Sequence, residues 1–225
     1  MSDLNSKKWI TAELHCHSIY SHDSSNQLED LIQTARERGI ERLAITDHNT
    51  IAGALLAKKL APELIVVGEE VHTERGELIG YYMKEEIPRG LSVKETLRRF
   101  KDQGAFISIP HPFDLWRHGW RSEELLELLP EVDAVEVLNA RCLLKVHNIN
   151  ALAFSKKYNK PMLAGSDAHT LLEVGLAVTR LPVFNSAEEM RVSVEESQID
   201  GRMLSVGDHL KTSLQVGWSK MIGTK

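Results

Sequence analysis

The sequence predicts an α/β fold in which mostly parallel strands form a barrel, and three observations lead to this. Short apolar and β-branched runs alternate with stretches of helical periodicity along most of the chain. The 225 residues are 42% hydrophobic and 26% charged, as in ordinary globular proteins, and no linker rich in proline, glycine or serine divides them. Seven or eight strand and helix units in about 200 residues fit a barrel better than an open sheet.

The expected strands are the apolar runs, and most of them precede a helical segment. In segment 28–38 the apolar residues fall at helical spacing and Gly39 ends the helix, whereas segment 77–83 is expected to pair with its predecessor as a hairpin. The expected strands are 9–14, 42–46, 64–71, 77–83, 105–109, 134–138, 161–164 and 176–181. The expected helices are 28–38, 51–60, 93–103, 123–129 and 144–158.

The C-terminal part of the chain has a weaker pattern. Ser186 is expected to cap a helix that runs to about Gln198, and a polar tail is expected after Gly207. We therefore expect a single domain, with the barrel over residues 1–184 and a helical extension over residues 185–225 that packs on it.

Composition and charge exclude several classes of protein. The net charge of −5 and the pI of about 6.1 argue against a protein that coats nucleic acid by charge alone. The longest apolar runs are far shorter than the roughly 18 residues of a membrane span, and the N-terminus has no basic region followed by an apolar one. Two cysteines provide no disulfide framework. We expect a cytoplasmic protein.

Histidine is unusually frequent, and its placement matters more than its number. The chain has ten histidines, and most of them follow expected strands together with acidic residues. These strand-end residues are His15, His17, Asp47, His48, Glu69, Glu70, His72, His111, Asp167 and His169. Because the carboxyl ends of barrel strands converge on one face, we expect them to point into a single cleft.

Local geometry supports metal binding at this face. In His15-Cys16-His17 the two imidazoles lie on the same side of an extended segment and can hold one cation, whereas Cys16 points away. Asp47 is expected to bond a ligand histidine rather than a metal. Arg117 and Arg141 follow strand ends, where a guanidinium can bind phosphate bidentately, although arginines on loops are usually solvated.

The motifs resemble those of the PHP family, the polymerase and histidinol phosphatase superfamily. They are His15-Cys16-His17-Ser18, Ser21-His22-Asp23-Ser24, Ile45-Thr46-Asp47-His48-Asn49-Thr50, Gly68-Glu69-Glu70-Val71, Ile109-Pro110-His111-Pro112 and Gly165-Ser166-Asp167-Ala168-His169. They occur in order over residues 9–182. The resemblance implies a distorted (βα)7 TIM-like barrel, up to three divalent metal ions at the strand ends, and hydrolysis of phosphate esters.

The same resemblance implies the metal ligands one by one. Many members have an acid directly after the serine, where this chain has His22, so Asp23 takes that role and His22 competes with it. Glu77 stands where many members have a histidine, and it is either a ligand or a solvated hairpin residue. The full expected set is His15, His17, Asp23, His48, Glu70, Glu77, His111, Asp167 and His169. Asp23, Glu70 and Asp167 are the expected catalytic residues.

Counting ligands also leads to three metal ions. A catalytic metal takes about three protein ligands and keeps one position open, so eight or nine ligands suit three ions, with Glu70 as a candidate bridge. Histidine and carboxylate ligands suit zinc, manganese or iron. The expected reaction is attack of metal-activated water on phosphorus, without a covalent phosphoenzyme.

The sequence is compatible with several alternatives. A small phosphorylated metabolite or a nucleotide is the preferred substrate, because a binder of long polyanions would carry more clustered lysine and arginine. A PHP-type nuclease acting on nucleic-acid ends is the alternative of the same chemistry. Barrel hydrolases with His-x-His on the first strand also cleave C–N bonds, and a metal-stabilised module without catalysis is the remaining possibility. Trp116 and Trp120 either stack on a substrate ring or pack under a loop.

Overall fold

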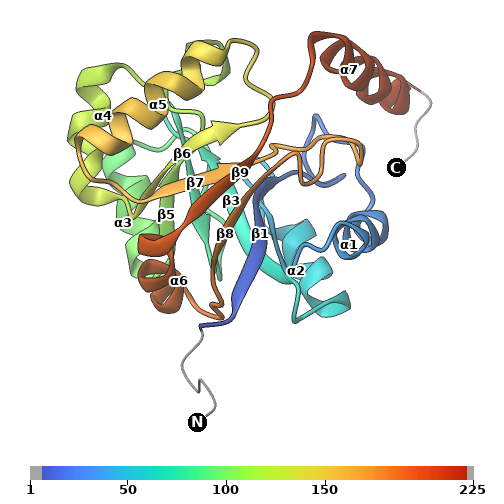
Figure 1. Cartoon of the computed structure of the whole chain (residues 1–225), viewed down its shortest axis with the longest axis horizontal. Helices are drawn as coiled ribbons and strands as arrows, with labels where there is room; N and C mark the ends of the chain where they lie inside the picture. The colour runs from blue at the N-terminus through green and yellow to red at the C-terminus, as the bar shows by residue number, and fades with distance from the viewer. Residues whose placement is uncertain (1–6, 222–225) are drawn as a thin grey trace.

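A single sheet of nine strands organises the computed structural model, which describes residues 7–221 (Figure 1). Its strand order is β7-β6-β5-β4-β3-β2-β1-β8-β9. The strands are β1 (Trp9–Cys16), β2 (Arg42–Ile45), β3 (Ile65–His72), β4 (Glu77–Tyr81), β5 (Phe106–Ile109), β6 (Ala134–Asn139), β7 (Met162–Gly165), β8 (Ala177–Pro182) and β9 (Gln198–Gly201).

The sheet closes almost completely into a barrel where the end of β7 meets β1. The amide of Asp167 donates to the carbonyl of His15 at 2.7 Å, and the amide of His17 donates to the carbonyl of Ala168 at 2.9 Å. Parallel pairing joins β1 to β2, β2 to β3, β5 to β6 and β6 to β7. The expected α/β barrel in one domain is therefore confirmed.

The strand count differs from the seven parallel units of the expected (βα)7 barrel. β4 pairs antiparallel with β3, because only a tight turn and no helix separates the two strands, and it also pairs antiparallel with β5. β8 and β9 also pair antiparallel, β8 along β1 and β9 along β8. The hairpin expected at 77–83 accounts for the first of these differences.

Helices cover the outside of the barrel (Figure 1). They are α1 (Leu28–Glu37), α2 (Ala52–Leu60), α3 (Val93–Asp102), α4 (Ser122–Leu128), α5 (Lys145–Lys157), α6 (Ala187–Ser193) and α7 (Val206–Met221), with short 3-10 turns at Leu115–Arg117, Leu129–Glu131 and Val194–Glu196. Helix α1 buries the four apolar residues that its sequence spacing predicted. None of the helices among residues 7–221 has the length and hydropathy that crossing a lipid bilayer requires.

The barrel interior is filled by apolar side chains, and α6 closes one end of it. Side chains from successive strands form one buried cluster with residues of α6: Ile10, Ala12, Leu14, Ala44, Val66, Ile79, Tyr81, Phe106, Ala134, Leu163, Ala187 and Met190. Burial of each large aliphatic side chain contributes about 1.5–3 kcal/mol. Because the interior is packed and α6 closes one end of the barrel, a site is available at the other end, where the parallel strands have their carboxyl ends.

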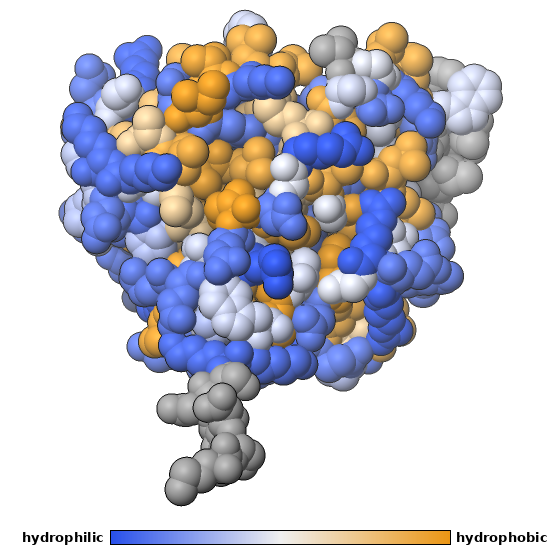
Figure 2. Space-filling view, in the orientation of Figure 1, coloured by the Kyte–Doolittle hydropathy of each residue, from blue (hydrophilic) through white to orange (hydrophobic). Residues whose placement is uncertain are grey.

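Helix α5 carries apolar residues on two faces. Ala151 and Phe154 are buried, whereas Val146, Ile149 and Leu152 are exposed. Figure 2 shows hydrophobic side chains gathered in the upper half of the visible face, where Figure 1 places this helix.

The segment after residue 184 differs in detail from the expected helix and polar tail. The expected helix up to Gln198 ends early in α6 and a 3-10 turn, and β9 then adds a strand to the sheet. The expected polar tail is helix α7, in which Thr212 and Val216 are buried on one side. Their four-residue spacing is a helical signal that the surrounding polar residues obscured. The domain boundary at residue 184 stays a prediction.

Candidate metal centre

The structure brings all nine expected ligands together at the carboxyl ends of the barrel strands. Eight of them lie near the carboxyl end of a parallel strand or in the loop that follows it, as expected for a parallel barrel, whereas Glu77 begins the antiparallel strand β4. His15 and His17 belong to the end of β1 and Asp23 to the next loop, His48 follows β2, Glu70 lies in β3, Glu77 begins β4, His111 follows β5, and Asp167 and His169 follow β7.

Glu70 lies at the centre of this cluster. Its Oε2 is 3.3 Å from Nε2 of both His15 and His17 and 3.2 Å from Nδ1 of His48. Its Oε1 is 3.1 Å from Nε2 of His111. A carboxylate with its two oxygens facing different imidazoles has the geometry that a bridge between ions requires.

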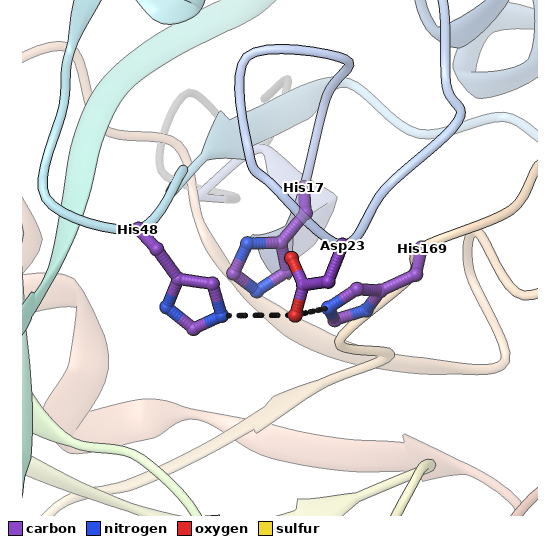
Figure 3. A group of neighbouring side chains, drawn as sticks. All are labelled: His17, Asp23, His48 and His169. Atoms are coloured by element: carbon purple, nitrogen blue, oxygen red, sulfur yellow. Dashed lines mark ion pairs between the residues drawn. The ribbon is translucent and has the colours of Figure 1, made fainter. Parts of the chain in front are cut away.

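Asp23 lies between two imidazoles on the solvent side of the cluster. Its Oδ2 is 3.1 Å from Nε2 of His169 and 3.4 Å from Nε2 of His48, and His17 completes the group (Figure 3). The side chain of His22 is 80% exposed. The loop geometry therefore directs Asp23 into the cluster and leaves His22 at the surface.

Glu77 faces the cluster rather than open solvent. Its carboxylate lies 3.6 Å from Nε2 of His111 and 3.7 Å from Nδ1 of His48. On its other side it is 3.4 Å from Nδ1 of His72, and His118 belongs to the same group. The antiparallel pairing of β3 with β4 places Glu77 directly opposite His72.

Asp167 closes the cluster from the β7 side. Its Oδ1 lies 3.3 Å from Nε2 of His17, and its Oδ2 accepts hydrogen bonds from Arg117 and, at 3.0 Å, from Asn139. Asp167 and His111 both have positive φ angles, 56° and 27°. Non-glycine residues hold such strained backbone where the surrounding structure enforces it, which is frequent at functional sites.

Glu136, for which the sequence alone indicates no role, positions two of the histidines. Its Oε1 is 3.0 Å from Nδ1 of His15, and its Oε2 accepts hydrogen bonds from the amide of His111 at 2.8 Å and from Asn139 at 2.9 Å. A carboxylate behind a ligand histidine fixes the ring and its tautomer. The indication of this role in the sequence is the position of Glu136 on an expected strand whose end lies at the face of the barrel that carries the histidines.

Polar residues next to β1 fix the loop that carries His17. Asp47 accepts two hydrogen bonds of 2.6 Å from Ser18, through its amide and its hydroxyl. This differs from the expected bond between Asp47 and a ligand histidine, because among the described residues Ser18 lies against the Asp47 carboxylate instead. Ser21 instead contacts Nδ1 of His17 at 3.1 Å and accepts a bond from the amide of His48.

Burial and opposite charges set the pKa values of the acids and imidazoles in the cluster. Burial would raise the pKa of Glu70 and Asp167, but the neighbouring cationic groups hold both well below the usual range. Burial lowers the pKa of His17, but the facing carboxylates of Asp167 and Glu70 outweigh it and raise the pKa to about 10. The protein alone therefore leaves carboxylates charged, and each needs a positive partner.

The donor set fits divalent metal ions. Three groups each place their ligand atoms within 4.8 Å of one another: His17, Asp23, His48 and His169; His15, His111 and Asp167; and His15, His17 and Glu70. The buried Oδ1 atoms of Asp23 and Asp167 have no hydrogen-bond partner among the described residues. Imidazole nitrogens with carboxylate oxygens suit zinc, manganese or iron.

A cleft of about 640 Å³ opens above the cluster. Arg117 and Arg141 line it, the first bonded to Asp167 and the second 3.0 Å from Glu173. Trp116 also lines it and is 72% exposed. Trp120 is instead buried and donates its indole N–H to the Glu77 carbonyl, so it packs under the loop and is unavailable for stacking.

Comparison with known proteins identifies the family and agrees with the fold. A model described as PHP domain matches residues 13–110, and one described as PHP-associated matches residues 145–198. The chain is 38% identical over 191 residues to the protein MJ0417 of Methanocaldococcus jannaschii, covering 83% of this chain and 77% of that one. It is 33% identical over 151 residues to a phosphoribosyl 1,2-cyclic phosphate 1,2-diphosphodiesterase of Eggerthella lenta, covering 62% of this chain and 53% of that one.

Two solved structures, a PHP-like protein and an endonuclease, share the fold of this chain. A two-domain protein of Bacteroides vulgatus, containing a predicted PHP-like metal-dependent phosphoesterase, matches with a TM-score of 0.72 at 17% identity, covering 95% of this chain and 71% of that one. The lesion-specific endonuclease EndoQ of Pyrococcus furiosus matches with a TM-score of 0.60 at 17% identity, covering 85% and 58%. With the family matches and the relative from Methanocaldococcus jannaschii, the motifs lead to one conclusion: the chain belongs to the PHP family of metal-dependent phosphoesterases.

Proposed function

We propose that this protein hydrolyses a phosphate ester of a small phosphorylated metabolite or a nucleotide, using up to three divalent ions of zinc, manganese or iron. The observation that carries the proposal is the convergence of histidine and carboxylate donors around Glu70, directly below a cleft lined by Arg89, Arg117 and Arg141. The proposed ligands are His15, His17, Asp23, His48, Glu70, Glu77, His111, Asp167 and His169.

The metal ions would supply an activated water molecule and neutralise the charge that develops on the phosphate oxygens. The protein's part is to hold the nine donors in place without large rearrangement. Glu136 fixes the ring of His15, and Ser21 fixes that of His17. Asp23 lies at the edge of the cleft and is the least buried of the three proposed catalytic carboxylates, so it is placed to meet the substrate directly.

Arg117 and Arg141 are the proposed phosphate-binding residues. Both line the cleft, and a guanidinium presents paired N–H donors that match phosphate oxygens. In the free protein each contacts a buried carboxylate, Asp167 or Glu173, which holds the side chain near the cluster before substrate binds. Substrate phosphate would receive the remaining donors of each arginine.

The cleft favours a small substrate over a long nucleic acid. The arginines that line its described part are Arg89, Arg117 and Arg141, no lysine among the described residues lines it, and Arg117 and Arg141 are already paired with acids. Tight binding of a polyanion needs many unpaired cations along a path. The Eggerthella lenta relative, whose name refers to a small phosphorylated sugar, also supports this choice.

The test is phosphate release by protein loaded with manganese or zinc, measured on sugar phosphates, nucleoside mono- and bisphosphates, cyclic phosphates and short oligonucleotides. Turnover of one class of small phosphate ester, with oligonucleotides left intact, is the expected result. Cleavage of oligonucleotides alone would show a nuclease. Hydrolysis of amide or lactam bonds without phosphate release would show C–N chemistry, and absence of any turnover by metal-loaded protein would show a non-catalytic module.

A further inference from the structure

A second group of metal-binding side chains lies beside the metal centre and has no part in the proposed reaction. Asp114, Cys142 and His147 place one carboxylate oxygen, one thiol sulfur and one imidazole nitrogen within 4.8 Å of one another. Asp114 and Cys142 are each 1% exposed, and the side chain of His147 is 15% exposed. Nδ1 of His147 is 3.4 Å from Oδ2 of Asp114.

The carboxylate of Asp114 is the strongest sign that this group has a ligand. Both of its oxygens are buried, and neither has a hydrogen-bond partner among the described residues. Asp114 precedes the 3-10 turn Leu115–Arg117, where an aspartate usually accepts from the turn's amides, yet its side chain makes no such bond. Nδ1 of His147 also lacks a hydrogen-bond partner. Buried polar groups left in this way are rare and require an explanation.

We infer that Asp114, Cys142 and His147 bind one Zn²⁺ ion at a site separate from the cluster around Glu70. Zinc takes thiolate, imidazole and carboxylate ligands together, at about 2.0–2.3 Å, which separates tetrahedral ligand atoms by about 3.3–3.8 Å. The 3.4 Å between Nδ1 of His147 and Oδ2 of Asp114 already falls in this range, and all three ligand atoms lie within 4.8 Å of one another, so side-chain rotation needs to close at most about 1–1.5 Å. On binding, the Cys142 thiol releases its proton to solvent as the Zn–S bond forms. A water molecule would complete the four ligands that zinc takes.

This ion would fasten the loop that carries two residues of the main site. The amide of Asp114 donates to the His111 carbonyl at 3.0 Å, and the amide of Arg117 donates to the Asp114 carbonyl at 2.9 Å. Cys142 and His147 belong to the segment between β6 and the first turn of α5. A zinc ion at the three side chains would therefore tie the loop of His111 and Arg117 to that segment. The inference does not depend on the proposed reaction.

Cobalt absorption tests this inference without any measurement of activity. The protein is stripped of metal and reloaded with Co²⁺, and its near-ultraviolet spectrum is searched for sulfur-to-cobalt charge transfer. The proposed ligands around Glu70 are nitrogen and oxygen, so a thiolate band reports Cys142. We expect the band in the unmodified protein and in His17→Ala. In Cys142→Ser we expect the band to disappear and the protein to bind one equivalent of cobalt fewer.

Cys16→Ser is the matched control, because Cys16 is also buried but packs in the apolar core with its sulfur 4.0 Å from the Ala168 carbonyl. This variant should keep the band. A second variant, Asp114→Asn, keeps the thiol and the side-chain volume and should weaken cobalt binding at this site at least about tenfold. No band in the unmodified protein, a band that persists in Cys142→Ser, or unchanged cobalt affinity in Asp114→Asn would overturn the inference.

Discussion

Nδ1 of His15 lies 3.0 Å from a carboxylate oxygen of Glu136, and both side chains are buried. This contact fixes the ring so that Nε2 faces Glu70 and the neighbouring histidine donors. The same carboxylate receives the amide of His111, so one side chain of β6 positions residues from β1 and from the loop after β5. Glu136 is therefore a positioning residue for the proposed metal centre.

Glu136→Gln should lower metal affinity about 10- to 100-fold, because the amide supports the His15 ring less well than a carboxylate does. Competition with a chromogenic chelator measures this. Glu123→Gln, on the exposed surface of α4, is the matched control and should bind metal like the unmodified protein. Equal affinities for the two variants would contradict the positioning role.

Arg117→Lys should raise KM about tenfold or more, since lysine retains the charge but loses the paired donors that fit phosphate. Steady-state kinetics of phosphate release on the best substrate measures the effect. Arg98→Lys on the exposed side of α3 serves as control. An unchanged KM in Arg117→Lys would remove this residue from substrate binding.

Removal of metal should destabilise the protein. The ions bind the cluster only in the folded state, so their binding free energy adds to the free energy of unfolding and is lost when they are removed. With free metal at 100 times its Kd, binding contributes about 2.7 kcal/mol, which corresponds to a fall in Tm of about 5–10 °C on chelation. Differential scanning calorimetry with and without chelator measures this. Metal affinity should also fall as pH decreases, because protons compete for the histidine ligands. A Tm that neither chelator nor added metal changes would contradict a metal centre.

Gly165→Ala should destabilise the barrel by about 1–3 kcal/mol through overpacking. A Cβ at Gly165, the last residue of β7, would lie 2.3 Å from Cβ of His15 and 2.7 Å from a carboxylate oxygen of Glu136. Gly217→Ala in helix α7 is the control, since nothing lies within 4 Å of its added Cβ, and should stabilise by about 0.5–1 kcal/mol. Urea unfolding compares the two. A stable Gly165→Ala protein would show that this close approach is relaxed in solution.

The sequence predicts those features of the fold and the site that follow from local periodicity and from the convergence of strand ends in a parallel barrel. Strand runs located His48, His111 and Asp167 at strand ends, and convergence of those ends is a property of any parallel barrel. The sequence pattern also indicates the β3–β4 hairpin, but it does not give the number of strands in the sheet. Register and closure depend on pairings between distant segments, which periodicity does not contain.

The parts that could not be predicted involve contacts between side chains far apart in the chain. Glu136 and His15 are separated by 121 residues, and nothing local shows that their side chains meet. The choice of Asp23 over His22 depends on how one loop turns. The group of Asp114, Cys142 and His147 likewise appears only when the loop after β5 is placed against α5.

The central claim, that the histidine and carboxylate cluster performs phosphoester hydrolysis, is tested most directly by one pair of variants. His17 is fully buried in the cluster, whereas the side chain of His22, five residues away, is 80% exposed. Phosphate release by metal-loaded protein should fall by about 100-fold or more in His17→Ala, with an unchanged circular dichroism spectrum, and should stay near the unmodified level in His22→Ala. Equal turnover by the two variants would contradict the account.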